Sequence, residues 1–169
     1  MSVLIGSDLG EVLFFGDDGN DTVIGGEGND TLISVSGSDF LFGGGGDDTL
    51  LGGTDPSAIH TLNGGVGNDL LQAGDGLTRL EGGAGLDTLV GGEGIDEFIT
   101  DINDTLAVPG DIDIVENFTV GEDSLIISGA GPDSTVEYDA ETGLLSVDGI
   151  AVFQLDPGLT IDGDDYLIL

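Results

Sequence analysis

A nine-residue repeat runs from Ser7 to Ile99 and constrains the fold more than any other feature of the sequence. Its clearest copies begin at Gly25 and Gly82. Each is a glycine-rich turn that ends in Asp, followed by three residues with an apolar one in the middle. Glycine adopts the positive φ values that tight turns need, and such a three-residue strand turns one side chain inward. Since nine residues cannot bury an apolar face alone, the copies have to stack.

Ten units fill this region, and three positions carry the pattern. An irregular twelve-residue unit, residues 52–63, separates five regular copies from four more. Position four is glycine in nine units and position six is Asp in seven. Position eight is apolar in every unit, and its residues are Phe14, Val23, Leu32, Leu41, Leu50, Leu62, Leu71, Leu80, Leu89 and Phe98.

Two units together contain strand, turn, strand and turn, which is enough for one closed coil of a solenoid. The sequence therefore predicts an all-β fold, a right-handed parallel β-roll. Two short parallel sheets would face each other across the position-eight side chains, and a row of turns would run along each edge. The predicted roll occupies residues 1–99.

Acidic residues dominate the charge of the chain. It has 34 Asp and Glu against a single cation, Arg79, and its net charge is −33. This charge repels phosphates and anionic lipids, so we expect neither nucleic acid nor membrane insertion. High net charge opposes collapse, yet 38% of the residues are hydrophobic and regularly spaced. We therefore expect a chain that folds when divalent cations neutralise its carboxylates.

The pattern Gly-Gly-x-Gly-x-Asp-x-apolar-x resembles the RTX (repeats-in-toxin) family of calcium-binding nonapeptide repeats, over residues 7–99. In that family calcium lies between successive turns of the roll. The resemblance implies several bound Ca²⁺ ions and a secreted or cell-surface protein. It also implies transient contact with a type I ABC exporter.

Alternate units lie on the same edge of a roll, so the position-six Asp residues fall into two rows. Ca²⁺ takes about 6–8 oxygen ligands, and two stacked turns offer two carboxylates and the carbonyls of the glycine-rich loop. Turn formation alone would also favour Asp, but it leaves stacked carboxylates without a cation. The predicted carboxylate ligands are Asp30, Asp48, Asp69 and Asp87 on the first edge and Asp21, Asp39 and Asp96 on the second. The predicted carbonyl ligands are turn residues such as Gly25, Glu27, Gly43, Gly45, Gly64, Val66, Gly82 and Ala84.

The two rows differ in continuity. The first edge has Asp in four successive units, whereas His60 and Thr78 interrupt the second edge near the irregular unit. We expect an unbroken calcium row on the first edge and a gap on the second. His60 stands alone in the sequence, so we expect a loop or partly buried residue rather than a catalytic base or zinc ligand.

Outward-facing apolar residues are concentrated in the first half of the repeats. Position nine is apolar at Phe15, Ile24, Ile33, Phe42 and Leu51, whereas the next three units carry Asn63, Gln72 and Glu81 there. Such a stripe predicts self-association or contact with a companion domain. Ordinary β-propensity on a half-exposed sheet is an equal interpretation.

Residues 100–169 are predicted to form a β-rich capping and secretion-signal region. The stretch 111–128 is similar to the segment that follows the repeats in RTX exoproteins. Ser134–Tyr138 and Leu144–Asp148 predict a hairpin, with a further strand at Ile150–Leu155. The acidic and then apolar end, residues 164–169, resembles the uncleaved export signal of type I secreted proteins. A strand that seals the roll is an equal interpretation.

No arrangement of residues indicates catalysis. The chain has one His and no Cys, and neither a zinc-protease nor a phosphate-binding motif occurs. The sequence therefore predicts a secreted calcium-binding module, without enzyme activity, that folds outside the cell. Two alternatives stay open: an accessory repeat module of a larger exoenzyme, and an adhesive surface that contacts carbohydrate or ice.

Overall fold

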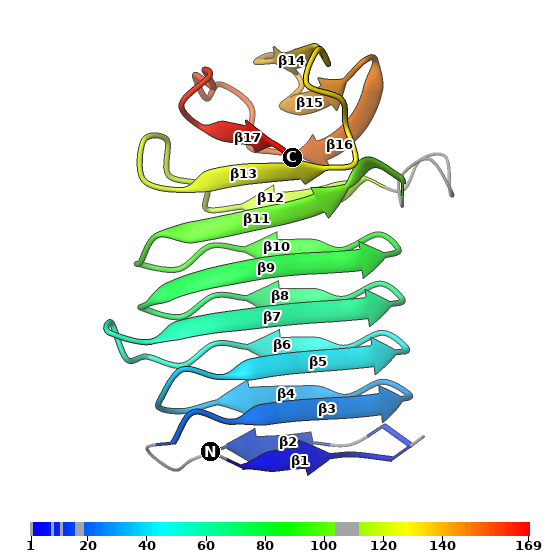
Figure 1. Cartoon of the computed structure of the whole chain (residues 1–169), viewed down its shortest axis with the longest axis vertical. Coiled ribbons are helices and arrows are strands. Elements are labelled where there is room, and N and C mark those ends of the chain that lie inside the picture. Colours follow the sequence, from blue (N-terminus) through cyan, green and yellow to red (C-terminus); the bar gives the residue numbers. More distant parts are fainter. Residues whose placement is uncertain (1, 8, 11, 16–18, 104–111) are drawn as a thin grey trace.

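The chain winds into a stack of coils in which two β-sheets face each other (Figure 1). The structure is a computed structural model that describes residues 2–7, 9–10, 12–15, 19–103 and 112–169; for residues 12–15 only the backbone is considered. This architecture confirms the predicted parallel β-roll. Within the described residues, no helix has the length and apolar character to cross a membrane.

One sheet has eight strands, all parallel to their neighbours, in the order β1-β3-β5-β7-β9-β11-β13-β17. It takes every second strand of the coil. Its strands are β1 (Val3–Ile5), β3 (Thr22–Glu27), β5 (Phe40–Gly45), β7 (Ile59–Val66), β9 (Leu77–Ala84), β11 (Asp96–Asp101), β13 (Ser124–Ser128) and β17 (Tyr166–Ile168).

The facing sheet has nine strands in the order β14-β15-β16-β12-β10-β8-β6-β4-β2. Pairing is parallel from β2 to β16 and antiparallel from β16 to β14. Its strands are β2 (Val12–Phe15), β4 (Thr31–Ser34), β6 (Thr49–Leu51), β8 (Leu70–Gln72), β10 (Thr88–Val90), β12 (Asp113–Glu116), β14 (Val136–Asp139), β15 (Leu144–Val147) and β16 (Ile150–Gln154).

The register shows how many residues each coil contains. Neighbours such as Thr31 and Thr49 are 18 residues apart, as two nonapeptides require. The irregular unit adds three residues to its coil, so Thr49 pairs with Leu70. The added residues lie in the turn between β6 and β7, and both sheets resume the 18-residue spacing afterwards.

The first coil differs from the prediction by one residue. Leu13, rather than Phe14, pairs with Leu32, and in the other sheet Leu4 pairs with Val23. Both spacings are 19 residues, so the phase predicted for the first copy was wrong at position eight. Strand β1 was not predicted, because Val3–Ile5 precedes the first turn of the repeat. The side chain of Phe14 lies outside the described residues.

The space between the sheets is filled by a column of leucines. From Val23 to Phe98, the nine later position-eight residues are completely buried, as predicted. Each strand turns one large apolar side chain inward and its neighbours outward, so the coils interlock without a large hydrophobic cluster in any single unit. Phe98 meets Phe118 with ring centroids 5.9 Å apart, which joins the repeat core to the following segment.

The two sheets continue beyond residue 99. Strand β12 pairs with β10 and strand β13 pairs with β11, both in parallel. The predicted division into residues 1–99 and 100–169 therefore does not correspond to a break in either sheet. The predicted hairpin is present as β14 and β15, and Tyr166–Ile168 adds the last strand of the eight-stranded sheet. Figure 1 shows these C-terminal strands covering one end of the stack.

Candidate metal centre

Buried Asp residues form a continuous ladder along the first edge, where the chain passes from the eight-stranded to the nine-stranded sheet. In each step, the backbone N–H of one Asp donates to Oδ1 of the Asp in the next coil. Asp30 bonds to Asp48, Asp48 to Asp69 and Asp69 to Asp87, each at 2.7 Å. We call this the inner ladder. Its four carboxylates are at most 2% exposed, so the predicted row is brought together as expected.

Three Asp residues that were not predicted make similar contacts beyond the repeats, one on the first edge and the others elsewhere. Oδ1 of Asp113 accepts the N–H of Asp87 at 3.2 Å, and on the second edge Oδ1 of Asp123 accepts the N–H of Asp96 at 2.9 Å. Asp165 accepts the N–H of Gly121 at 3.0 Å. A signal was available in the sequence, because Asp-x-apolar recurs at 113–115, 123–125 and 165–167.

A second ladder runs in the opposite direction at position five of the first edge. Oδ1 of Asn29 accepts the N–H of Asp47 in the following coil at 3.0 Å, and Asp47 in turn accepts the N–H of Asn68 at 2.9 Å. Asn68 accepts the N–H of Leu86 at 2.9 Å. Each turn is therefore joined to both neighbours, through a buried Asp on one side and an exposed Asn or Asp on the other.

The second carboxylate oxygen of three inner-ladder residues, Asp30, Asp48 and Asp69, lies beside a glycine carbonyl. Gly43 is at position one of its turn, and a Cβ there would lie 2.2 Å from Oδ2 of Asp48 and 2.5 Å from the carbonyl oxygen of Gly64. The same geometry holds at Gly64, where a Cβ would lie 2.2 Å from Oδ2 of Asp69 and 2.6 Å from the carbonyl of Gly82. Only glycine at position one leaves this space open. We call it a cradle.

A third cradle has Oδ2 of Asp30 and the carbonyl of Gly43 around Gly25, at 2.5 and 2.6 Å from a Cβ there. The series stops at Gly82, where the three nearest atoms all belong to Asp87. The first edge thus repeats one arrangement of oxygen atoms between successive turns.

The cradles fit a hard cation. Oδ2 of Asp48 and Oδ2 of Asp69 are buried and have no hydrogen-bond partner among the described residues. A buried carboxylate oxygen beside a carbonyl oxygen, with no donor, is costly unless a cation lies between them. The two nearest polar atoms of each cradle are a carboxylate oxygen and a carbonyl oxygen, which are the ligand types of Ca²⁺. No three His, Cys, Asp or Glu side chains gather in the described part of the chain, because each coil adds one Asp and the rest are backbone oxygens.

Burial also perturbs the acidity of this row. Burial raises the pKa of the Asp48 carboxyl to about 6, with smaller contributions from the negative charges of Asp69 and Asp30. Burial likewise raises the pKa of Asp69 to about 6, against the amide bond from Asp48 that stabilises its charged form. Without a neutralising cation, the buried surroundings of Asp48 and Asp69 therefore disfavour the charged form of both carboxyl groups.

The predicted carbonyl ligands lie at the ends of β3, β5, β7 and β9. Three of those at position three already accept hydrogen bonds. The carbonyls of Gly45, Val66 and Ala84 accept N–H groups of position-four glycines one coil earlier, at 2.5, 2.8 and 2.9 Å. The position-one carbonyls, such as that of Gly64, are the ones that face the carboxylate oxygens.

The second edge satisfies its carboxylates differently. Ser34 occupies position one, and its hydroxyl donates to Oδ2 of Asp39. Oδ2 of Asp96 accepts the N–H of Gly92 at 2.7 Å, while its Oδ1 has no hydrogen-bond partner among the described residues. Asp21 lies in the N-terminal coil of this edge, where Oδ1 accepts the N–H of Ser2. On the second edge, protein donors therefore reach Oδ2 of Asp39 and Oδ2 of Asp96, whereas on the first edge Oδ2 of Asp48 and Asp69 faces a cradle.

His60 lies inside the roll rather than in a loop. It is in β7 at the place of the ladder Asp, it is completely buried, and its Nδ1 accepts the N–H of Asp39 at 3.4 Å. The expectation of a loop or partly buried residue was wrong, because the irregular unit places its extra residues before the strand. Burial lowers the pKa of His60. Thr78 is also completely buried, so the predicted interruption of the carboxylate row is present.

A sequence model of the RTX calcium-binding nonapeptide repeat matches the chain four times, at residues 10–32, 15–50, 35–55 and 63–98. These segments contain the inner-ladder Asp residues and the three cradles. No curated protein matches the chain closely enough to count as a relative. Repeats of this family are structural calcium-binding units rather than catalytic ones. The β-roll of this chain therefore belongs to the RTX calcium-binding nonapeptide repeat family.

Proposed function

We propose that this chain is a secreted module whose folding waits for extracellular calcium. The observation that carries the proposal is the pair of buried, unpartnered oxygens, Oδ2 of Asp48 and Oδ2 of Asp69, each beside a glycine carbonyl. With calcium bound, these carboxylates gain the positive charge that their surroundings lack. Without it, stacked carboxylates repel one another in a chain whose net charge is −33.

The first edge would hold the ions. Asp30, Asp48 and Asp69, with the carbonyls of Gly43, Gly64 and Gly82, form the three cradles. Asp39 and Asp87 fit the role less well, because the hydroxyl of Ser34 donates to Asp39 and the three atoms nearest a Cβ at Gly82 all belong to Asp87. Asp96 has a wider arrangement, in which a Cβ at Gly91 would lie 3.3 Å from its Oδ2 and 3.0 Å from the carbonyl oxygen of Asn117, and its Oδ2 already accepts the N–H of Gly92. Asp21, at the N-terminal end of the second edge, accepts the N–H of Ser2.

The expected affinity for calcium determines in which compartment the chain would fold. Extracellular calcium modules bind at about 10⁻⁴–10⁻³ M, far above the free calcium of a cytosol. The chain would remain unfolded inside the cell and pass a type I ABC exporter as an extended polymer. Outside, the binding free energy would become folding free energy. RTX repeat proteins are typically secreted, which supports this order of events.

The adhesive alternative receives less support from the register. Thr31, Thr49 and Thr88 lie in one row on the outer face of the nine-stranded sheet, but Leu70 stands between Thr49 and Thr88. A regular array of hydroxyl groups, as an ice- or glycan-binding surface would use, is therefore interrupted at its centre.

The decisive experiment is circular dichroism of the chain in excess chelator and in millimolar calcium, with magnesium at the same concentration as control. We expect a disordered spectrum in chelator and in magnesium, and a β spectrum in calcium. Magnesium should fail because it demands near-ideal octahedral geometry and dehydrates reluctantly. A full β spectrum in chelator would contradict calcium-dependent folding.

A further inference from the structure

We propose that the N-terminal part of the outer face of the eight-stranded sheet is the surface through which two copies of this chain pack together. The face consists of the outward residues of β1, β3 and β5. We call it the apolar face, and its residues are Val3, Ile5, Thr22, Ile24, Phe40 and Phe42.

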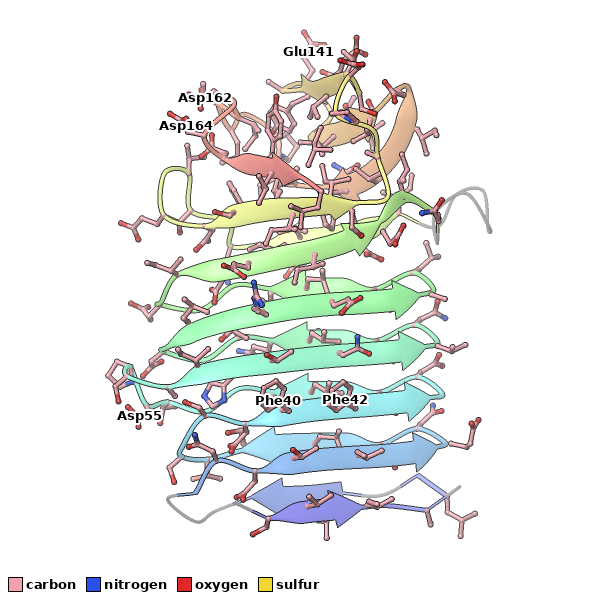
Figure 2. The ribbon with its side chains drawn as sticks, in the orientation of Figure 1. Phe40, Phe42, Asp55, Glu141, Asp162 and Asp164 are labelled. Carbon is pink, nitrogen blue, oxygen red and sulfur yellow. The ribbon has the colours of Figure 1, made fainter. Side chains whose placement is uncertain are left out.

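Backbone register makes these residues one continuous patch. Ile5 pairs with Ile24 and Ile24 with Phe42, so three apolar side chains form one column across the strands. Val3, Thr22 and Phe40 form the parallel column beside it. Val3 is 62% exposed, Ile5 67%, Phe40 50% and Phe42 37%, so four large apolar side chains are exposed within three successive strands of the sheet. Figure 2 shows Phe40 and Phe42 next to each other along β5.

The character of the same face changes one strand later. Beside Phe42 lies Asn63, whose Nδ2 donates to Oε2 of Glu81 at 2.9 Å. Further along, Arg79 and Glu97 form an ion pair. Strand propensity alone would apply equally to β9 and β11, yet their outward residues at these positions include Arg79, Glu81 and Glu97. The apolar columns of β1, β3 and β5 therefore end at β7, although single exposed apolar residues such as Ile59 and Leu167 lie elsewhere on the same sheet.

The distribution of charge on the chain favours a second copy as the partner that covers the apolar face. The apolar face contains no carboxylate, although the chain carries 34 of them. A basic partner would be drawn to the acidic edges, and anionic lipid would be repelled. A glycan needs hydrogen-bonding groups, and Thr22 alone offers one. A second copy presents the same carboxylate-free patch, so no carboxylate of either apolar face would be buried when one sheet packs about 10 Å from the other. The net charge of −33 on each copy opposes the contact, so we expect a dimer that forms only at high concentration. The contact would be isologous, which closes at a dimer.

Light scattering coupled to gel filtration, in calcium and over a wide range of concentration, tests this inference. We expect the mass to approach twice 17.0 kDa as concentration rises. The double substitution Phe40→Ser, Phe42→Ser should return the mass to that of a monomer while the β spectrum is kept. Leu86→Ser removes an equally exposed apolar side chain, 57% exposed, from a first-edge turn and should leave the dimer intact.

Two results would overturn the inference: a monomer at every concentration with the β spectrum present, or a dimer that survives in the double variant. Binding of neutral phosphatidylcholine vesicles by a monomeric chain would assign the face to lipid and would also overturn it. Calcium-dependent folding is read separately from circular dichroism, so failure of one proposal does not conceal failure of the other.

A labelling experiment covers the case in which the double variant does not fold. The chain has no Cys, so Thr22→Cys provides a single site for a pyrene label near the centre of the apolar face. We expect excimer fluorescence that grows with concentration in calcium. The matched control is Thr88→Cys in β10 of the other sheet, which should give none. Equal signals from both labels would contradict the inference.

Discussion

Asp48 and Asp69 are joined across one coil by a 2.7 Å hydrogen bond from the backbone N–H of Asp48 to Oδ1 of Asp69, while Oδ2 of each has no hydrogen-bond partner among the described residues. The two oxygens of one carboxylate therefore have separate roles. Oδ1 holds the neighbouring coil in register, and Oδ2 faces the cradle.

This division predicts the behaviour of Asp48→Asn. The amide keeps an oxygen for the backbone bond but loses the negative charge and presents an N–H₂ group to the cradle. We expect the calcium concentration at the folding midpoint to rise roughly tenfold or more, in line with about 1.5–3 kcal/mol for a contact to a charged group. In chelator the same variant should be easier to fold, because one repelling charge is gone. A calcium titration followed by circular dichroism measures both effects.

The control for that substitution is Asp156→Asn, which removes one charge from an exposed C-terminal position. If both variants shift the midpoint equally, net charge rather than the cradle determines the response, and the assignment of Asp48 fails.

Gly43→Ala should close a cradle without removing any ligand. The added methyl would lie 2.2 Å from Oδ2 of Asp48 and 2.5 Å from the carbonyl of Gly64. Such overlap costs about 1–3 kcal/mol or more through displacement of the neighbouring turn. We expect weaker calcium binding by calorimetry and a lower melting temperature in calcium. Gly163→Ala, where nothing lies within 4 Å, should change neither. A normal calcium affinity in Gly43→Ala would rule out the proposed cation position.

Lowering the pH should partly replace calcium in stabilising the folded chain. The pKa values of Asp48 and Asp69 are about 6 in the folded chain, against an ordinary 3.8. Between these values the folded, calcium-free chain binds more protons than the unfolded chain, so its stability rises as pH falls from about 6 towards 4. Above pH 6 the destabilisation is complete. With calcium present the trend reverses, since protons compete for the same oxygens.

The β signal of circular dichroism in chelator, and thermal melts in calcium, both at pH 7.5, 6 and 4.5, would test this pair of trends. The variant with Asn at both 48 and 69 should show a flatter pH dependence in chelator. A calcium-free stability that falls on acidification would contradict the prediction.

The leucine column predicts a contrast between two adjacent residues. Leu71 is completely buried and Leu70 is 38% exposed on the opposite side of β8. Leu71→Ala should lower the free energy of unfolding by about 2–5 kcal/mol, because it leaves a cavity between the sheets. Leu70→Ala should cost far less. Denaturant unfolding in saturating calcium measures both, and equal losses would mean that the column is not the core.

The repeated part of the fold could be predicted because the residues of each unit determine its local structure. Gly at positions one and four, Asp at six and Leu at eight determine the turn, the ladder and the core, and these residues recur often enough to establish the phase. Strand β1 lacks the turn that marks a unit, and the one-residue offset of Leu13 depends on how the first coil meets the second.

The remaining errors concern side chains whose burial or hydrogen bonds depend on neighbouring coils rather than on the sequence of their own unit. His60 is buried because the coils on both sides bury that position, although an isolated His gives no sign of it. The hydroxyl of Ser34 reaches Asp39 five residues later, which a repeat alignment treats as a substitution for glycine. Asp113 and Asp123 continue the ladder from outside the repeats, where a nine-residue period no longer points to them.

The irregular unit shows which dimension of the solenoid is fixed and which is adjustable. Its three additional residues lie in the turn that carries Asp55 (Figure 2), and the strands on either side keep their pairing. In this turn Asp55 accepts the N–H of Ser57 at 2.9 Å. The ladder hydrogen bonds thus fix the spacing between coils along the stacking axis, whereas a turn on the second edge can contain additional residues. A peptide grafted between Thr54 and Ser57 should therefore be displayed at the rim with both sheets unchanged, which makes this turn a natural insertion point in a scaffold governed by calcium.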